Sequence, residues 1–393
     1  MKLGDVADIV AGFAFSESYQ GRTNLPTPFI KVSDFAAAKE SWISSAANTV
    51  DDSLLRLIRA KVYPAGTVIF PKVGGALLTN KRARLEVAAT FDNNVMGLIP
   101  RRVDGDYLFW FMRQFDMAKL ANTQAIPSVR SSDVAQIEIP VPNLLEQRKI
   151  AARLKAQLAE VETARQAAQA QVKDAQRLRT RIMDALFDKI HDWQPISAVA
   201  KVQSGYAFKS ENFTTSGVRL LRNTNILPGK VYWDEVVYLD EEEARKYPSY
   251  VLAEGDILIS LDRPLISSGI KVARISKSDL PALLLQRVGR FLLKPGAVDP
   301  DFLHVFLQSS RFVAEISGHD QSLGVPHISP GQVEAIELPA LPIEKQREVA
   351  THLKAQLAEA DAIHRAATAQ LAEIEFLPQQ LLAQAFPSQG DVK

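Results

Sequence analysis

The chain contains one long segment twice, and this repeat constrains the fold more than any other feature. Residues 139–187 and 338–386 align at a constant shift of 199 residues, and the hexapeptide KAQLAE at 155–160 recurs unchanged at 354–359. Each copy is far longer than the unit of a solenoid, and there are only two copies. The repeat therefore predicts a duplicated pair of domains.

Each repeated segment follows a segment that is less similar between the copies. Residues 3–15 resemble 196–208 at a shift of 193, and residues 64–70 resemble 253–259 at a shift of 189. A shift that changes along the chain indicates loops of different length on a shared framework. We therefore divide the chain into a first head (1–141), a first long helix (142–190), a second head (191–340) and a second long helix (341–393).

The repeated segments are predicted to be two long helices that pair with each other. Apolar residues recur at spacings of three and four over 154–182 and again over 353–381, which is the pattern of a coiled-coil seam. Each helix would contain ~40 residues and be roughly 60 Å long. The alternative is that each helix packs only on its own head. A helix of this length would then leave much of its apolar stripe exposed. We expect antiparallel pairing, with the heads at opposite ends and a pseudo-twofold relation between the copies.

Three residues depart from the pattern of a regular coiled coil. Arg165 and His364 occupy matching seam positions, where a polar residue could fix the register or mark a place where the helices splay. Pro378 lies inside the second helix, where the first has Arg179. Because proline removes one backbone hydrogen bond, we expect the second helix to kink or end there.

The heads are predicted to be mixed domains of short strands and helices. Runs of β-branched and apolar residues alternate with Gly, Pro and Asn turns. The predicted strands are 68–70, 95–99 and 137–139 in the first head and 236–239, 257–261, 270–275 and 288–293 in the second. The predicted helices are 106–120 and 301–316. The fold class is therefore α+β, with two mixed heads and an antiparallel coiled coil of two long helices.

Composition and motifs argue against several classes of protein. The chain has no cysteine, which excludes a disulfide framework and cysteine-bound zinc. Its six histidines lack metal-ligand spacing, and no phosphate loop or metalloprotease or hydrolase motif is present. Because no signal peptide or apolar run approaching ~18 residues is found, we expect a cytoplasmic protein that does not enter a membrane. We expect no catalytic residue, metal or cofactor.

Basic and amide side chains cluster in glycine-containing loops of both heads. Such side chains contact base edges and phosphates in nucleic-acid complexes, although any one of them could simply belong to a solvated loop. The net charge is only +1, so a DNA-binding face must be local or shared with a partner. The candidate DNA-binding residues are Lys72, Lys81, Arg82, Arg84 and Asn94 in the first head and Arg222, Asn225, Arg263, Lys271 and Arg287 in the second.

The order of head, long helix, different head and similar long helix resembles the specificity subunit of type I restriction-modification enzymes. The resemblance covers essentially the whole chain. It rests on matched pairs of short motifs, which are IEIP at 137–140 and IELP at 336–339, EQR at 146–148 and KQR at 345–347, MDALF at 183–187 and LAQAF at 382–386, and GFAF at 12–15 and GYAF at 205–208.

This resemblance implies that each head is a target recognition domain that reads one half of a bipartite site in double-stranded DNA. The helices would set the spacing between the halves and dock two methyltransferase subunits, through which nuclease/translocase subunits join. The chain itself would be non-catalytic, and its partners would supply much of the DNA clamp. Pro378 and the acidic second helix depart from a symmetric docking surface.

Two other classes of protein compete with this interpretation. One is a non-catalytic coiled-coil scaffold with two protein-binding heads. The other is a fused methyltransferase or nuclease, which the absence of an NPPY-type motif disfavours.

Overall fold

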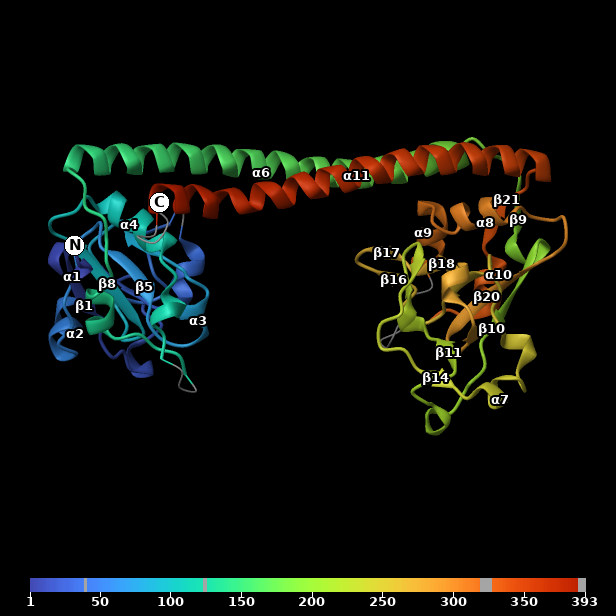
Figure 1. Cartoon of the computed structure of the whole chain (residues 1–393), viewed down its shortest axis with the longest axis horizontal. Coiled ribbons are helices and arrows are strands. Elements are labelled where there is room, and N and C mark those ends of the chain that lie inside the picture. The colour runs from blue at the N-terminus through green and yellow to red at the C-terminus, as the bar shows by residue number, and fades with distance from the viewer. Residues whose placement is uncertain (39–40, 123–125, 319–326, 388–393) are drawn as a thin grey trace. The chain divides into compact units, whose positions relative to one another are not determined.

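The computed structural model describes residues 1–38, 41–122, 126–318 and 327–387. Its contacts group the chain into two compact units, Met1–Ala168 with Gln370–Lys393, and Gln169–Ala369. Each unit contains one head and a part of both long helices, α6 (Leu144–Phe187) and α11 (Ile343–Ala385) (Figure 1). Among the described residues, no helix is long and apolar enough to cross a membrane.

The first head is built on a five-stranded sheet in the order β1-β8-β5-β6-β3, beside a three-stranded sheet in the order β4-β2-β7. The strands are β1 (Ala7–Ala11), β2 (Thr27–Ile30), β3 (Trp42–Ile43), β4 (Thr49–Val50), β5 (Val68–Pro71), β6 (Ala83–Leu85), β7 (Thr90–Phe91) and β8 (Val95–Pro100). The helices are α1 (Leu3–Val6), α2 (Asp52–Leu57), α3 (Gly75–Leu78), α4 (Gly105–Gln114) and α5 (Ser131–Ala135), with 3-10 turns η1 (Glu17–Tyr19), η2 (Val32–Ala37) and η3 (Met117–Leu120).

The second head has a four-stranded sheet in the order β10-β20-β15-β18 and a three-stranded sheet in the order β14-β11-β19. These strands are β10 (Ala200–Ser204), β11 (Val218–Leu221), β14 (Tyr238–Leu239), β15 (Ile257–Ser260), β18 (Val272–Arg274), β19 (Ala282–Leu284) and β20 (Val288–Leu293). The other strands pair in two-stranded sheets and are β9 (Trp193–Pro195), β12 (Ile226–Leu227), β13 (Lys230–Val231), β16 (Leu265–Ile266), β17 (Gly269–Ile270) and β21 (Glu337–Pro339). The helices are α7 (Glu241–Ala244), α8 (Pro300–Phe306), α9 (Ser310–Gly318) and α10 (Pro330–Ala335), with 3-10 turns η4 (Ile196–Ala198), η5 (Ser210–Asn212), η6 (Asn223–Asn225), η7 (Pro248–Tyr250) and η8 (Lys277–Asp279).

The two heads share one framework, as the repeat predicted. The order β1-β8-β5-β6 in the first head matches β10-β20-β15-β18 in the second, and β2 pairs parallel with β7 as β11 pairs with β19. The matched turns GFAF and GYAF both begin with glycine for a steric reason. A Cβ atom at Gly12 would lie 1.8 Å from the carbonyl oxygen of Asp92, and one at Gly205 would lie 2.1 Å from that of Leu285. Only glycine fits at either turn.

Some predicted elements differ from the structure. Residues 137–139 do not form a strand, because only Glu138 bridges to Lys2. The predicted helix at 106–120 is two elements, α4 and η3, and Asp116 caps η3 by accepting from the backbone N–H of Ala118. The predicted helix at 301–316 is likewise divided into α8 and α9.

The long helices pair antiparallel within each unit. In the first unit, Leu154 near the start of α6 and Leu382 near the end of α11 belong to one buried core. In the second unit, Met183 near the end of α6 and Leu353 near the start of α11 share another. Since each pairing joins the start of one helix to the end of the other, the predicted antiparallel coiled coil is confirmed.

The seam changes phase at the same place in both helices. Leu178 and Leu377, which the pattern placed in the seam, are 39% and 37% exposed, whereas the neighbouring Arg179 and Pro378 are half-buried. The prediction that Pro378 could end the helix is wrong, because α11 continues to Ala385. Apolar residues beyond the proline pack into the first head, and this burial holds the last turns in place although one backbone hydrogen bond is missing.

Both heads attach to the long helices through the same contact. Near the start of α6, the buried side chain of Gln147 accepts a hydrogen bond from the backbone N–H of Asp104 at 2.8 Å. Near the start of α11, Gln346 accepts one from Asp299, also at 2.8 Å. Each aspartate is the N-cap of the head helix that follows it, α4 or α8. The repeated EQR and KQR motifs therefore fix the base of each head.

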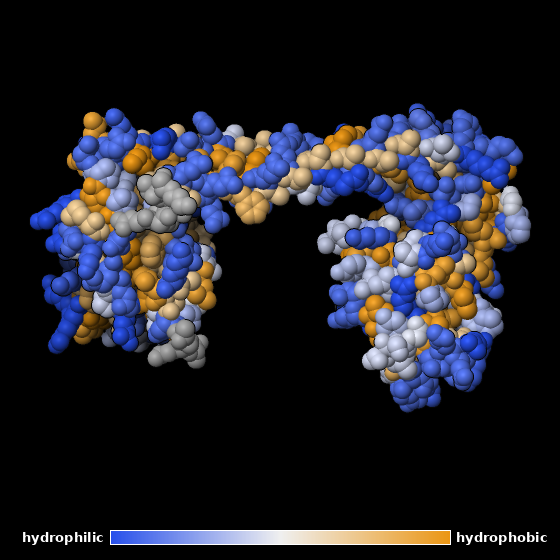
Figure 2. Space-filling model, viewed as in Figure 1, coloured by the Kyte–Doolittle hydropathy of each residue, from blue (hydrophilic) through white to orange (hydrophobic). Residues whose placement is uncertain are grey.

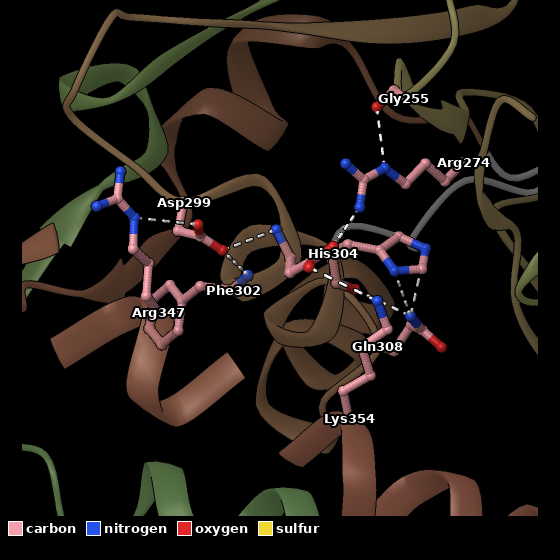
Figure 3. A network of polar contacts seen from close by, with 9 residues as sticks. Gly255, Arg274, Asp299, Phe302, His304, Gln308, Arg347 and Lys354 are labelled. Carbon is pink, nitrogen blue, oxygen red and sulfur yellow. Dashed lines mark hydrogen bonds and ion pairs between the residues drawn. The ribbon is translucent and has the colours of Figure 1, made fainter. Parts of the chain in front are cut away.

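A polar network surrounds this attachment in the second unit. Figure 3 shows Arg347 of α11 directed at Asp299, with 3.8 Å between Nε and the carboxylate. Arg274 of β18 makes an ion pair with Asp301, in the first turn of α8. His304, on the same helix, is largely buried, and burial followed by the nearby charge of Arg274 lowers its pKa to about 4. The head is thus joined to the helices by charged as well as apolar contacts.

Candidate nucleic-acid interface

The loops that carry several of the candidate residues lie at the same place in both frameworks. In the first head, the backbone N–H of Lys72, after β5, donates to the carbonyl of Asn94, before β8, at 2.9 Å. In the second head, the N–H of Leu261, after β15, donates to the carbonyl of Arg287, before β20, at 2.8 Å. Lys72 therefore corresponds to Leu261, and Asn94 corresponds to Arg287.

A third segment completes this site in each head. Val73 forms an isolated antiparallel bridge with Ser128, and Asp262 forms the same bridge with His327. Residues 128 and 327 precede the matched helices α5 and α10. The repeat of apolar-Pro at 126–127 and 325–326 could have drawn attention to this segment, although residues 325–326 lie outside the described residues.

Three of the five candidate residues in the second head gather around Asp262. The carboxylate of Asp262 lies 2.9 Å from Nη1 of Arg287 and 2.6 Å from Nδ1 of His327. Lys271 is buried next to it, and burial lowers the pKa of that lysine while the charge of Asp262 opposes the shift. Arg263 is exposed and its charge also lowers the pKa of Lys271. His327 belongs to this cluster but was not among the candidates.

Arg222 and Asn225, the other two candidates in the second head, stabilise a turn. Asn225 is 1% exposed, accepts from the backbone N–H of Arg222 at 3.1 Å and donates to the carbonyls of Tyr232 at 3.1 Å and Asp234 at 3.2 Å. The guanidinium of Arg222 donates to the carbonyl of Glu235. Both side chains thus hold the connection after β11 in place, and we assign them a structural role.

Arg82 in the first head is also an internal residue. Its guanidinium donates to the carbonyls of Met112 at 3.1 Å and Lys81 at 2.7 Å and to the side-chain oxygen of Asn80 at 2.6 Å. Burial lowers its pKa to about 9. These contacts tie the loop before β6 to the end of α4, so the guanidinium is occupied inside the head.

Arg84 is buried between two aromatic rings. Its guanidinium carbon lies 4.0 Å from the ring centroid of Trp42 and 4.1 Å from that of Phe109, and it makes an ion pair with Asp106. The corresponding ion pair in the second head joins Arg274 to Asp301. A contact repeated in both heads belongs to the shared framework, and we therefore remove Arg84 from the candidate interface.

The remaining candidates in the first head are accessible. Lys81 and Asn94 are exposed and Lys72 is half-buried. The backbone N–H of Asn94 donates to the carboxylate of Asp92 at 2.9 Å, which fixes the turn that presents the asparagine. The accessible candidates in the two heads are therefore Lys72, Lys81, Asn94, Arg263 and Arg287.

The same architecture occurs in known proteins. The sequence model of the type I restriction modification DNA specificity domain matches residues 1–172. The chain is 31% identical over 314 residues to the type I restriction enzyme MjaVIII specificity subunit of Methanocaldococcus jannaschii, which covers 74% of this chain and 69% of that subunit. The chain belongs to the family of type I restriction enzyme specificity subunits.

Other relatives match a part of the sequence or the fold. The EcoAI specificity subunit of Escherichia coli is 46% identical over 158 residues, which is 40% of this chain but only 27% of that subunit. The HsdS subunit from Thermoanaerobacter tengcongensis shares the fold with a TM-score of 0.60 at 19% identity, covering 100% of this chain and 96% of that one. A chain from a study of complex assembly in a type I R-M system gives a TM-score of 0.74 at 18% identity, covering 100% and 97%.

Proposed function

We propose that this chain is the DNA sequence-recognition subunit of a type I restriction-modification complex. Each head would read one half of a bipartite site in double-stranded DNA. The observation that carries the proposal is the difference between matched loops on a common framework. Asn94 stands where the second head has Arg287, and Val73 stands where it has Asp262. Different side chains on one scaffold are suited to reading two different half-sites.

The charge distribution supports a DNA complex that is shared with partners. Lys81, Arg263 and Arg287 are exposed in the heads, where cations can contact phosphates and base edges. The whole chain has a net charge of only +1. Because non-specific affinity for DNA depends on the number of phosphates neutralised, the chain alone would bind DNA weakly, and its partners would contribute much of the affinity.

The partners that we propose are two methyltransferase subunits, with nuclease/translocase subunits joining through them. The long helices would dock the methyltransferases and set the spacing between the two half-sites. Large apolar side chains remain exposed on both helices, and Figure 2 shows apolar patches along their surface. Exposed apolar patches are typical of interaction surfaces. The exposed residues are Leu144, Leu145, Leu178, Ile363, Phe376 and Leu377.

The partner subunits would catalyse methylation and cleavage, and this chain would recognise the DNA sequence without catalysing either reaction. The relatives come from a bacterium and an archaeon, whose DNA lies in the cytoplasm, and we propose that compartment for this chain.

Site-resolved methylation sequencing tests the proposal. Genomic DNA is incubated with S-adenosylmethionine and the full chain, its methyltransferase subunits, or both. We expect methylation only when both are present, at one sequence with two defined halves and a spacer of constant length. Methylation or cleavage by the chain alone would contradict the proposal. So would a methyltransferase whose sites are the same without the chain, as would be found if the chain were a protein-binding scaffold.

A further inference from the structure

A buried carboxylate in the second head holds two exposed side chains at once. The side chain of Asp262 is 9% exposed, whereas those of Arg287 and His327 are 62% and 57% exposed. Arg287 binds one carboxylate oxygen at 2.9 Å and His327 binds the other at 2.6 Å. Since the two oxygens belong to one carboxylate, the guanidinium and the imidazole are held side by side at the surface of the head.

The chemistry of this contact fixes what the pair can offer to a ligand. A carboxylate only accepts hydrogen bonds, so Nδ1 of His327 carries the hydrogen that it donates to Asp262. In the neutral imidazole, Nε2 is then an acceptor. Arg287 has five N–H donors, and it faces Asp262 with Nη1, so its other donors, including both on Nη2, can serve a ligand. The pair therefore presents a donor next to an acceptor.

The framework of the head does not require this cluster. At the matched positions the first head has Val73 for Asp262, Asn94 for Arg287 and Ser128 for His327. The first head forms the same bridge and the same backbone hydrogen bond without the three side chains. A feature that is present in one head alone, within the loops that differ between the heads, suits recognition better than folding.

The backbone in this region also indicates a functional constraint. Arg287 has a φ of 68° and Arg263 a φ of 45°, in the left-handed region that residues other than glycine seldom adopt. At the position of Arg263 the first head has Gly74, with a φ of 74°. The second head thus keeps an arginine where glycine would be relaxed. Strained backbone of this kind concentrates at functional sites.

We propose that Asp262 positions Arg287 and His327 as a donor–acceptor pair that reads one G·C base pair of the second half-site in the major groove. Arg287 would donate to O6 or N7 of guanine, and Nε2 of His327 would accept from the N4 amino group of the paired cytosine. Arginine to guanine is the commonest specific contact between a side chain and a base, which favours G·C over A·T. This inference rests on the function proposed above, and Asp262 acts in it as a positioning residue.

The test is selection from a randomised double-stranded DNA library by the full chain assembled with its methyltransferase subunits. The variants are Asp262→Asn, which keeps the shape but removes the charge, Arg287→Ala, His327→Ala and the charge-retaining Asp262→Glu. Glu254→Gln removes an exposed carboxylate from the same head and is the matched control. Arg287 and His327 are exposed, so their variants should fold even if Asp262→Asn is unstable.

We expect Arg287→Ala, His327→Ala and Asp262→Asn to relax the preference at one and the same G·C pair, by roughly 5- to 150-fold. The double variant Asp262→Asn with Arg287→Ala should lose no more than Asp262→Asn alone, because the loss of the carboxylate already displaces Arg287. Asp262→Glu should recover part of the preference, and Glu254→Gln should match the wild type. The other positions and the first half-site should be unchanged, which a general loss of stability would not produce.

Other outcomes separate this inference from the function on which it rests. If the wild type selects a bipartite site but the folded variants keep its specificity, or relax different positions, the assignment of this cluster is wrong and the function stands. Relaxation of an A·T pair would overturn the assignment to G·C. If the wild-type assembly selects no sequence, the proposed function itself fails.

Discussion

Gln346 of α11 accepts a hydrogen bond from the backbone N–H of Asp299 at 2.8 Å, and the glutamine is only 1% exposed. The same contact joins Gln147 to Asp104 in the first unit. In each unit a buried glutamine amide of a long helix therefore accepts a hydrogen bond from the N-cap residue of a head helix. A constant base of this kind allows the loops of the heads to differ without changing how each head meets the helices.

Replacing Gln346 with alanine should destabilise the second unit. The substitution leaves the buried N–H of Asp299 without its acceptor, which costs about 1–3 kcal/mol. Denaturant unfolding of the full chain measures the loss, and Gln147→Ala should cause a similar loss in the first unit. Gln370→Ala, on the exposed surface of α11, is the control and should change the free energy of unfolding by less than about 0.5 kcal/mol. Equal effects for Gln346 and Gln370 would show that the buried contact is unimportant.

Replacing Arg84 with alanine should reduce stability and leave DNA specificity unchanged. The guanidinium packs between Trp42 and Phe109 and pairs with Asp106, and we expect a loss of about 1–3 kcal/mol from these contacts. Thermal unfolding and methylation-site sequencing are the two measurements. A folded variant that relaxes a base of the first half-site would return Arg84 to the DNA interface.

The stability of the second unit should fall between pH 6.5 and pH 4. The pKa of His304 is lowered to about 4 in the folded chain, against 6.5 for an ordinary histidine. Below pH 6.5 the unfolded chain therefore binds a proton that the folded chain does not, which favours unfolding as the pH falls. Above pH 6.5 neither state binds the proton and His304 adds no pH dependence. We expect it to account for about 2–3 kcal/mol between these limits.

The variant His304→Phe tests this contribution, because phenylalanine stands at the matching position of the first head as Phe109. Denaturant unfolding at pH 7.5, 6 and 5 should show a smaller loss of stability for the variant than for the wild type. Identical pH profiles would mean that His304 titrates in the folded chain as it does in the unfolded one.

Replacing Lys81 with alanine should weaken binding to all DNA sequences about equally. An exposed lysine that contacts a phosphate adds to affinity through the release of counterions. Its loss should reduce the slope of log affinity against log salt concentration by about 0.9, without changing the methylated sequence. Lys173→Ala, on the exposed surface of α6, is the control. A change of sequence preference in the Lys81 variant would instead indicate contact with a base.

The sequence predicted the elements that depend on regular spacing. The seam spacing predicted two long helices, because a period near 3.5 determines which face is apolar. The repeat at a shift of 199 residues predicted their antiparallel pairing through a local twofold. The pattern failed at Leu178 and Leu377, which are exposed. Which residue faces the interface at this position depends on the contacts that each helix makes there. Arg179 faces the interface in place of Leu178, and its Nη1 lies 2.7 Å from the carboxylate of Asp361.

The candidate site was less predictable, because it depends on contacts between residues far apart in the chain. Arg82 and Arg287 are the same residue type in polar loops, yet Arg82 is buried by the end of α4, 30 residues later. His327 meets Asp262 across 65 residues, and no local spacing could indicate that contact. Residue type therefore identified the loops, whereas tertiary packing decides which of their side chains are accessible.

Each head, as proposed above, reads its own half of the DNA site. The most direct measurement is methylation-site sequencing with a chain whose second head, 191–340, is replaced by the corresponding head of another member of the family, assembled with the same methyltransferase subunits. We expect one half of the methylated sequence to change completely, while the other half and the length of the spacer stay as they are. A change in both halves, or in neither, from a folded and active assembly would contradict this proposal.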